Sequence, residues 1–189
     1  MALFDIEEYQ ERVRKTKMSM AEKGIDVLVV SDPANMNYLT GYDGWSFYVP
    51  QVVILSIDDD EPIWVGRGMD ANGAKHTTYL SHERIIGYAD VYVQTPVKHP
   101  MQVVAGEIKK RGWDTKTIGT EMDAYYFSAK SFVELQKSLP NAKFDDANLL
   151  VSWVRIIKSA REIEFMQKAG KIAERVMQTA IDTVAPGVR

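Results

Sequence analysis

The chain has 189 residues and a formal net charge of −3, which gives no support to a nucleic-acid or anionic-membrane partner. Hydrophobic residues make up 46% and charged residues 26%, the composition of a globular chain long enough to bury its own core. The absence of cysteine excludes disulfides, thiolate catalysis and cysteine-based zinc sites. No apolar run reaches the length of a signal core or a membrane span, so we expect a cytoplasmic protein.

The chain opens with a predicted helix, a buried strand and an unusual connection. The helix is expected over Ile6–Lys23, with Asp5 as its N-cap and Gly24 just past its end. Asp26–Ser31 is rich in β-branched residues, which is typical of a buried strand. Residues 32–51, DPANMNYLTGYDGWSFYVPQ, are interpreted as a loop because they are rich in turn residues, yet they carry five aromatic side chains.

A hairpin with an acidic tip follows this connection. Its strands are expected over Val52–Ile57 and Pro62–Val65, and residues 58–61, DDDE, form the tip. The acidic run either binds a cation or is a solvated turn, and the turn is the favoured interpretation.

The remaining elements of the first 154 residues alternate between helices and strands. They are expected as a helix at 70–78, a strand at 84–88, a helix from His99-Pro100 to just before Gly112, a strand at 117–120, a helix capped by Asp123 and running to about Ser138, and an edge strand at 143–145. This pattern predicts an α/β fold in which a mixed sheet is flanked by helices on both faces.

A long helix is expected near the end of the chain. Residues 159–162, SARE, form a capping box, and apolar residues then keep a helical period for about 25 residues, until Ala185-Pro186-Gly187. No later segment covers this apolar stripe, which favours the interpretation that the chain is the front part of a longer protein. The alternative is a helix that docks on the domain or pairs in a dimer.

Common catalytic patterns are absent from the sequence. His76, His82 and His99 show no metal-binding spacing, and we favour surface or turn roles for all three. There is no G-x-S-x-G elbow, and Gly66-Arg67-Gly68 lacks the third glycine of a dinucleotide fingerprint. The residues therefore build no complete active site, although they could supply part of one.

The strongest candidate for such a part lies in residues 32–51. Aromatic faces beside a few polar groups suit a small organic ligand, in particular a delocalised cation. The candidate substrate-binding residues are Trp45, Phe47, Tyr48 and Gln51. Packing is an equally weighted alternative for the three rings, whereas Tyr38 and Leu39 are expected to plug the sheet edge.

Two motifs resemble the creatinase/prolidase superfamily (M24, pita-bread). Residues 35–42, NMNYLTGY, resemble the N-x-x-Y-L-(T/S)-G-(F/Y) segment of its amino-terminal domain, and residues 155–163, RIIKSAREI, resemble the R-x-I-K-S-x-x-E-(I/L) junction to its catalytic domain. The resemblance covers nearly the whole chain. It implies a ribonuclease-H-like creatinase/prolidase N-terminal domain over residues 1–154, then the linker and first helix of a truncated catalytic domain over residues 155–189.

The same resemblance implies where the chemistry lies. Catalytic groups belong to the carboxy-terminal half of such enzymes, so we expect no catalytic residue, metal or other cofactor in this chain and no activity from it alone. A peptidase-like protein would use a divalent metal, manganese or cobalt, in that other half. The amino-terminal domain typically caps the active site of a dimer partner, which implies a homodimer with a small-molecule substrate at the interface.

Two segments, residues 43–51 and 121–129, most resemble the ectoine hydrolase branch, which opens a non-peptide C–N bond in a cyclic amidine. Creatinase, which acts on a guanidino compound, is similar in this region. At the position of Val49, however, creatinase carries an arginine, and that arginine helps to hold the substrate carboxylate. The difference argues against creatine as the substrate. Two alternatives stay open. One is the N-terminal domain of a proline-specific metallopeptidase (Xaa-Pro dipeptidase or aminopeptidase), and the other is a stand-alone binding or dimerisation module.

Overall fold

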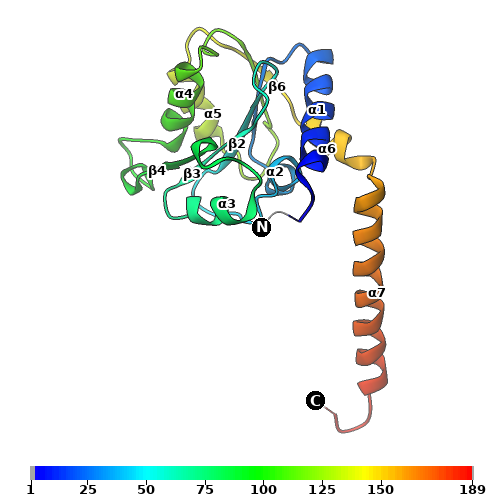
Figure 1. Cartoon of the computed structure of the whole chain (residues 1–189). Helices are drawn as coiled ribbons and strands as arrows, with labels where there is room; N and C mark the ends of the chain where they lie inside the picture. Colours follow the sequence, from blue (N-terminus) through cyan, green and yellow to red (C-terminus); the bar gives the residue numbers. More distant parts are fainter. Residues whose placement is uncertain (1–2, 189) are drawn as a thin grey trace. The chain divides into compact units, whose positions relative to one another are not determined.

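The chain divides into two units, with the boundary in the sequence between Val154 and Arg155, and a mixed sheet forms the centre of the first unit (Figure 1). The computed structural model describes residues 3–188. Within them, six strands pair in the order β4-β3-β2-β1-β5-β6. The strands are β1 (Val27–Val30), β2 (Val52–Ser56), β3 (Ile63–Arg67), β4 (Ile85–Tyr88), β5 (Thr117–Thr120) and β6 (Lys143–Asp146).

Strand direction gathers several loops at one edge of this sheet. β2 is antiparallel to β1 and to β3, whereas β1–β5, β3–β4 and β5–β6 are parallel pairs. The carboxyl ends of β1, β3, β4 and β5 therefore meet at one edge, where β2 begins. We call this the loop edge.

Helices cover both faces of the sheet, as the sequence predicts. Alternate side chains of β1 point to opposite faces, so that Leu28 and Val30 join one core cluster while Val27 and Val29 join the other. The first cluster receives side chains from α1 (Ile6–Glu22), α2 (Pro33–Thr40), α3 (Ala71–Thr77) and α6 (Leu150–Ile156), and the second from α4 (Pro100–Lys110) and α5 (Ala129–Ser138). The α/β fold expected from the pattern is thus confirmed.

The structure corrects the interpretation of residues 32–51 as a loop throughout, because Pro33–Thr40 is the helix α2. The Asp32 carboxylate accepts hydrogen bonds from two backbone amides of the first turn, at 2.9 and 3.1 Å. Gly41 ends the helix in the left-handed region, with φ 81°. Eight residues are too few to show a clear helical period, so only the caps indicated this helix.

The predicted start of the helix after β5 is wrong. Asp123 does not cap it; α5 begins at Ala129, and Ser128 is the N-cap, accepting from the Ser131 amide at 3.1 Å. Two turns occupy the residues between β5 and α5, and the buried ring of Phe127 anchors them to the core. Two residues suited to capping lie close together here, and the sequence alone does not decide between them.

The second unit contains the long helix expected from the sequence. α7 spans Ala160–Thr183, 24 residues, and both hydrogen bonds of the predicted capping box are present. The Glu162 amide donates to Ser159 Oγ at 3.1 Å, and the Ser159 amide donates to Glu162 Oε2 at 2.8 Å. None of the residues of α7 is buried.

Cations of the chain itself form ion pairs with carboxylates of the acidic hairpin tip. Arg84 Nη2 lies 2.9 Å from Asp59 Oδ1, and Lys116 Nζ lies 3.1 Å from Asp58 Oδ2. Burial would raise the pKa of Asp59, but the hydrogen bonds and charge of Arg84 outweigh it and lower that pKa. The run is therefore a turn fastened by ion pairs, which supports the turn over a cation site.

A buried carboxylate joins the ends of the two central parallel strands. Glu121, 2% exposed, follows β5, and its Oε2 accepts from the amides of Ser31 and Asp32 at 2.7 and 2.8 Å. Its Oε1 accepts from Asn35 Nδ2 at 2.6 Å. Burial raises the pKa of Glu121, although these hydrogen bonds oppose the change. One side chain thus fixes the end of β1 and the start of α2 against β5.

Removing this acceptor should weaken the fold. Glu121→Ala leaves buried donors without a partner, so we expect the free energy of unfolding to fall by about 3 kcal/mol. Urea denaturation measures this value.

The neutral variant Glu121→Gln tests the role of the charge. Burial raises the folded-state pKa of Glu121 above its ordinary value of 4.5. The contribution of Glu121 to folding stability is therefore fully present below pH 4.5 and decreases as the pH rises through the folded-state pKa. The stability of the unaltered chain relative to Glu121→Gln should therefore decline between acidic and neutral pH. A relative stability that increases over this range would contradict the assignment.

Candidate functional site

The segment between α2 and β2, residues 42–51, projects three large rings from the loop edge. We call it the aromatic loop. Trp45, Phe47 and Tyr48 are 60%, 70% and 54% exposed, so they add little to the core of the described chain. Tyr38 and Leu39, just before the loop, are buried as expected. Adjacent exposed rings of this size are typical of an interaction site rather than of ordinary surface.

A column of buried groups supports the base of the aromatic loop. The ring of Tyr42 packs on the buried indole of Trp64, with centroids 5.1 Å apart. That indole lies across Gly66, where a Cβ would overlap it, and a Cβ on Gly44 would lie 2.8 Å from the Tyr42 hydroxyl. Both glycines are therefore needed for close packing. Burial, assisted by the negative charge of Asp70, raises the pKa of Tyr42 to about 12, so its ring stays neutral at physiological pH.

Hydrogen bonds fasten the second half of the loop. The Tyr88 hydroxyl of β4 donates to the Pro50 carbonyl at 2.6 Å, and the Val49 amide donates to Ser46 Oγ at 3.3 Å. Burial raises the pKa of Tyr88, which keeps this donor protonated. The loop is thus anchored to the sheet immediately after its exposed rings.

An arginine at the end of β3 positions Tyr48. Arg67 Nη1 donates to the Tyr48 hydroxyl at 3.0 Å, while its Nε and Nη2 donate to the two oxygens of Asp90 at 2.7 and 3.0 Å. The hydrogen bonds to Asp90 raise the pKa of Arg67. This fork geometry orients the guanidinium and, through it, the phenol.

Two tyrosines that the sequence interpretation did not assign to the site complete its aromatic surface. Tyr125 and Tyr126 lie in the loop between β5 and α5 and meet edge to face, with centroids 5.4 Å apart. Tyr126 also meets Trp45 at 6.1 Å, and Trp45 meets Phe47 at 6.3 Å. The sequence signal for these site residues was a pair of adjacent aromatic residues just after a predicted strand. They were not assigned to the site because a helix was predicted to begin at Asp123.

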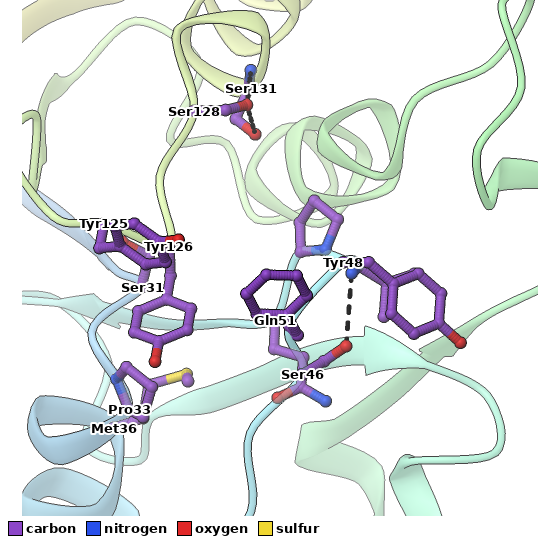
Figure 2. Close-up of a pocket in the computed structure, with 13 residues that line it drawn as sticks. Ser31, Pro33, Met36, Ser46, Tyr48, Gln51, Tyr125, Tyr126, Ser128 and Ser131 are labelled. Atoms are coloured by element: carbon purple, nitrogen blue, oxygen red, sulfur yellow. Dashed lines mark hydrogen bonds between the residues drawn. The ribbon is translucent and has the colours of Figure 1, made fainter.

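A small pocket lies between the aromatic loop and these tyrosines. Figure 2 shows Tyr125, Tyr126 and Ser31 on one side of it, and Ser46, Tyr48 and Gln51 on the other. Its volume is about 150 Å³. The pocket lies outside the carboxyl ends of β1 and β5, which continue into helices on opposite faces of the sheet. Ligands of α/β proteins preferentially bind at such a point.

The four predicted site residues divide between this pocket and a second cavity on the other side of the aromatic loop. Phe47 and Tyr48 line both, Gln51 lines only the first, and Trp45 only the second. Gln51 is 5% exposed, and its Nε2 donates to Asp70 Oδ2 at 2.9 Å, so much of its role is to hold the base of the loop.

Residues 3–188 contain no group of three or more histidine, aspartate or glutamate side chains arranged to hold a metal ion. His99 has a structural role, because its Nδ1 accepts from the Met101 amide at 3.2 Å and caps α4. Burial lowers the pKa of His99, which favours this neutral acceptor form. Among the helices in this part of the chain, none is both long and apolar enough to cross a membrane.

The sheet order and the covered faces define an α/β domain with a pocket at its loop edge. Residues 12–157 match the model of the creatinase/prolidase N-terminal domain, and the chain belongs to this family. It is 51% identical over 186 residues to the ectoine hydrolase of Halomonas elongata and 50% identical over 186 residues to the uncharacterised hydrolase/peptidase y4tM of Sinorhizobium fredii. The dipeptidase PepE of Mycobacterium ulcerans has a similar fold, with a TM-score of 0.71 and 20% identity over 97% of this chain.

The chain spans about half the length of the relatives that it matches. The alignments cover 98% of this chain but 46% of the ectoine hydrolase and 47% of y4tM, and the structural match covers 46% of the dipeptidase. These values agree with a family in which this domain is one part of a larger hydrolase.

The buried column provides a test of how the aromatic loop is held. Gly66→Ala forces a methyl group into the Trp64 indole, so we expect the free energy of unfolding to fall by about 1–3 kcal/mol. Gly106→Ala is the matched control, since α4 has open space at that position and a helical alanine should stabilise the chain by about 1 kcal/mol. Equal changes in the free energy of unfolding for the two variants, measured by urea denaturation, would show that close packing in this column does not support the loop.

Proposed function

We propose that the chain is the substrate-capping N-terminal part of a hydrolase of non-peptide C–N bonds, and that the substrate is ectoine. The observation that carries the capping role is a firmly supported loop that exposes Trp45, Phe47 and Tyr48. A ring cluster that is not needed for the core, beside a small pocket, is suited to contact a ligand or the rim of another active site. The 51% identity to an ectoine hydrolase supports the choice of substrate.

In this proposal the two units have different roles. Residues 1–154 form the recognition domain, and residues 155–189 are the linker and the first helix of the catalytic domain. The exposed apolar stripe of α7, which includes Ile172, Val176 and Ile181, supports the second role, because such a face requires a covering partner. The catalytic groups would belong to that domain. The recognition domain would cap the active site of a second copy in a cytoplasmic homodimer.

The recognition domain contributes binding and exclusion of water rather than bond cleavage. The electron-rich faces of the rings attract a delocalised amidinium, and this attraction strengthens as water is displaced. Closing the rings over the substrate also fixes its orientation toward the catalytic groups. Both effects depend on rings that are held in position before the ligand arrives.

A proline-specific peptidase is the second candidate. The dipeptidase of Mycobacterium ulcerans shares the fold, which makes this function structurally compatible. At 20% identity that likeness concerns the fold alone, whereas the ectoine hydrolase is 51% identical over an alignment that covers 98% of the chain. A divalent metal outside this chain, manganese or cobalt, would accompany the peptidase function.

The substrate test uses the complete protein with ectoine, creatine and an Xaa-Pro dipeptide. We expect hydrolysis of ectoine and none by the 189-residue chain alone. Chromatographic detection of the ring-opened product measures both results. Cleavage of the dipeptide without cleavage of ectoine would establish the peptidase instead.

The exposed rings should matter more to turnover than to folding. Trp45→Ala and Phe47→Ala, each in the complete protein, should lower kcat/KM for ectoine about tenfold or more, because each removes a ring–cation contact. Because both rings are exposed, the free energy of unfolding should change by only about 0.5 kcal/mol. Val133→Ala on α5, where the side chain is 52% exposed, is the control and should change neither value. A large loss of stability with unchanged kinetics would identify the rings as packing residues.

A further inference from the structure

The second cavity combines aromatic rings with a carboxylate. It lies between the aromatic loop and the turn that joins β3 to α3, and its volume is about 320 Å³. Trp45, Phe47 and Tyr48 line one side, and Met69 and Asp70 come from the turn. Rings beside an acidic group are the usual environment for an organic cation in proteins.

One guanidinium and two carboxylates set the charge around this cavity. Arg67 lines the cavity, and both oxygens of Asp90 accept its hydrogen bonds. Asp70, which also lines the cavity, lies near enough for its charge to act on Arg67, and its Oδ2 accepts from the neutral amide of Gln51 at 2.9 Å. With two carboxylates beside one guanidinium, the net charge around the cavity is negative.

The backbone position of Asp70 shows that its carboxylate does not serve the adjacent helix. Asp70 is the N-cap residue of α3 but makes no side-chain capping bond, and its backbone is already helical, with φ −75° and ψ −22°. An aspartate at this position normally accepts from the amides of the first turn. Here the buried Gln51 holds the carboxylate toward the base of the aromatic loop instead.

We propose that this second cavity binds the cationic group of the ligand, an amidinium or guanidinium, with Asp70 as its counter-charge and Trp45 and Tyr48 as its aromatic walls. The identity of the natural ligand rests on the proposed function. The binding of a planar organic cation does not, because it follows from the cavity alone. Asp70 then becomes a specificity residue that the sequence pattern did not indicate, located about 20 residues after the rings that it assists.

The test is a titration of the ¹⁵N-labelled 189-residue chain with acetamidinium, and separately with acetamide, its neutral analogue of the same shape. The indole N–H signal of Trp45, identified by its loss in Trp45→Phe, is the readout. Acetamidinium should shift this signal to saturation, and acetamide should not. Equal shifts with the two probes, or no saturable shift with acetamidinium, would overturn the proposal without any altered protein.

Two charge variants locate the site. Asp70→Asn keeps an acceptor for Gln51 and should weaken acetamidinium binding about tenfold or more, since a charged partner is lost. Asp60→Asn, at the exposed hairpin tip, removes the same charge elsewhere and should leave the affinity unchanged. Unchanged affinity in Asp70→Asn would overturn the role of Asp70. Binding of acetamidinium by a protein that does not hydrolyse ectoine would reject the proposed function while retaining this site.

Discussion

The carboxylate of Glu121 is the constraint on which the loop edge depends. Parallel strands are held by slanted backbone hydrogen bonds, and these end at the last paired residue, Thr120 opposite Val29. Beyond that point three donors of the neighbouring segment converge on Glu121 instead. Because they include Asn35 of α2, the same side chain orients the helix that delivers the aromatic loop. Burial of this carboxylate is costly, which raises its pKa, and the three hydrogen bonds offset only part of that cost.

The position of α2, fixed by Glu121, determines where the aromatic loop begins. α2 ends at Gly41, and the chain must then return to β2 within ten residues, so the aromatic loop is short for the rings that it carries. Tyr42 turns inward onto Trp64, which leaves the following rings directed outward. The hydrogen bond from Tyr88 to Pro50 closes the loop. Rings held at both ends lose little freedom when a ligand binds, and this preorganisation favours affinity from few contacts.

The strands, the sheet class and the long terminal helix could be predicted because each has a recognisable pattern. The strands have β-branched runs, the sheet class follows from the succession of strands and helices, and the terminal helix has the capping box at Ser159. α2 and the start of α5 could not, since a short helix has no clear period and since Asp123 and Ser128 are equally suited to capping. Among the site residues, the rings of the aromatic loop were recognisable by composition. Tyr126 and Asp70 were not, because their proximity to Trp45 and Gln51 is created by strand order, which no local pattern encodes.

Strand order also explains how one edge of this domain gathers the residues that we propose as determinants of specificity. Several loops of the chain reach one edge of the sheet, and exposed loop residues vary more readily than the two cores beneath them. The dipeptidase neighbour, with 20% identity and a TM-score of 0.71, demonstrates that the scaffold tolerates almost complete replacement of its sequence. Substrate preference must therefore be argued from the loop edge and not from the fold. Here that edge presents exposed rings, an arginine paired with Asp90 and the carboxylate of Asp70, and the proposed preference for a planar cation rests on these groups.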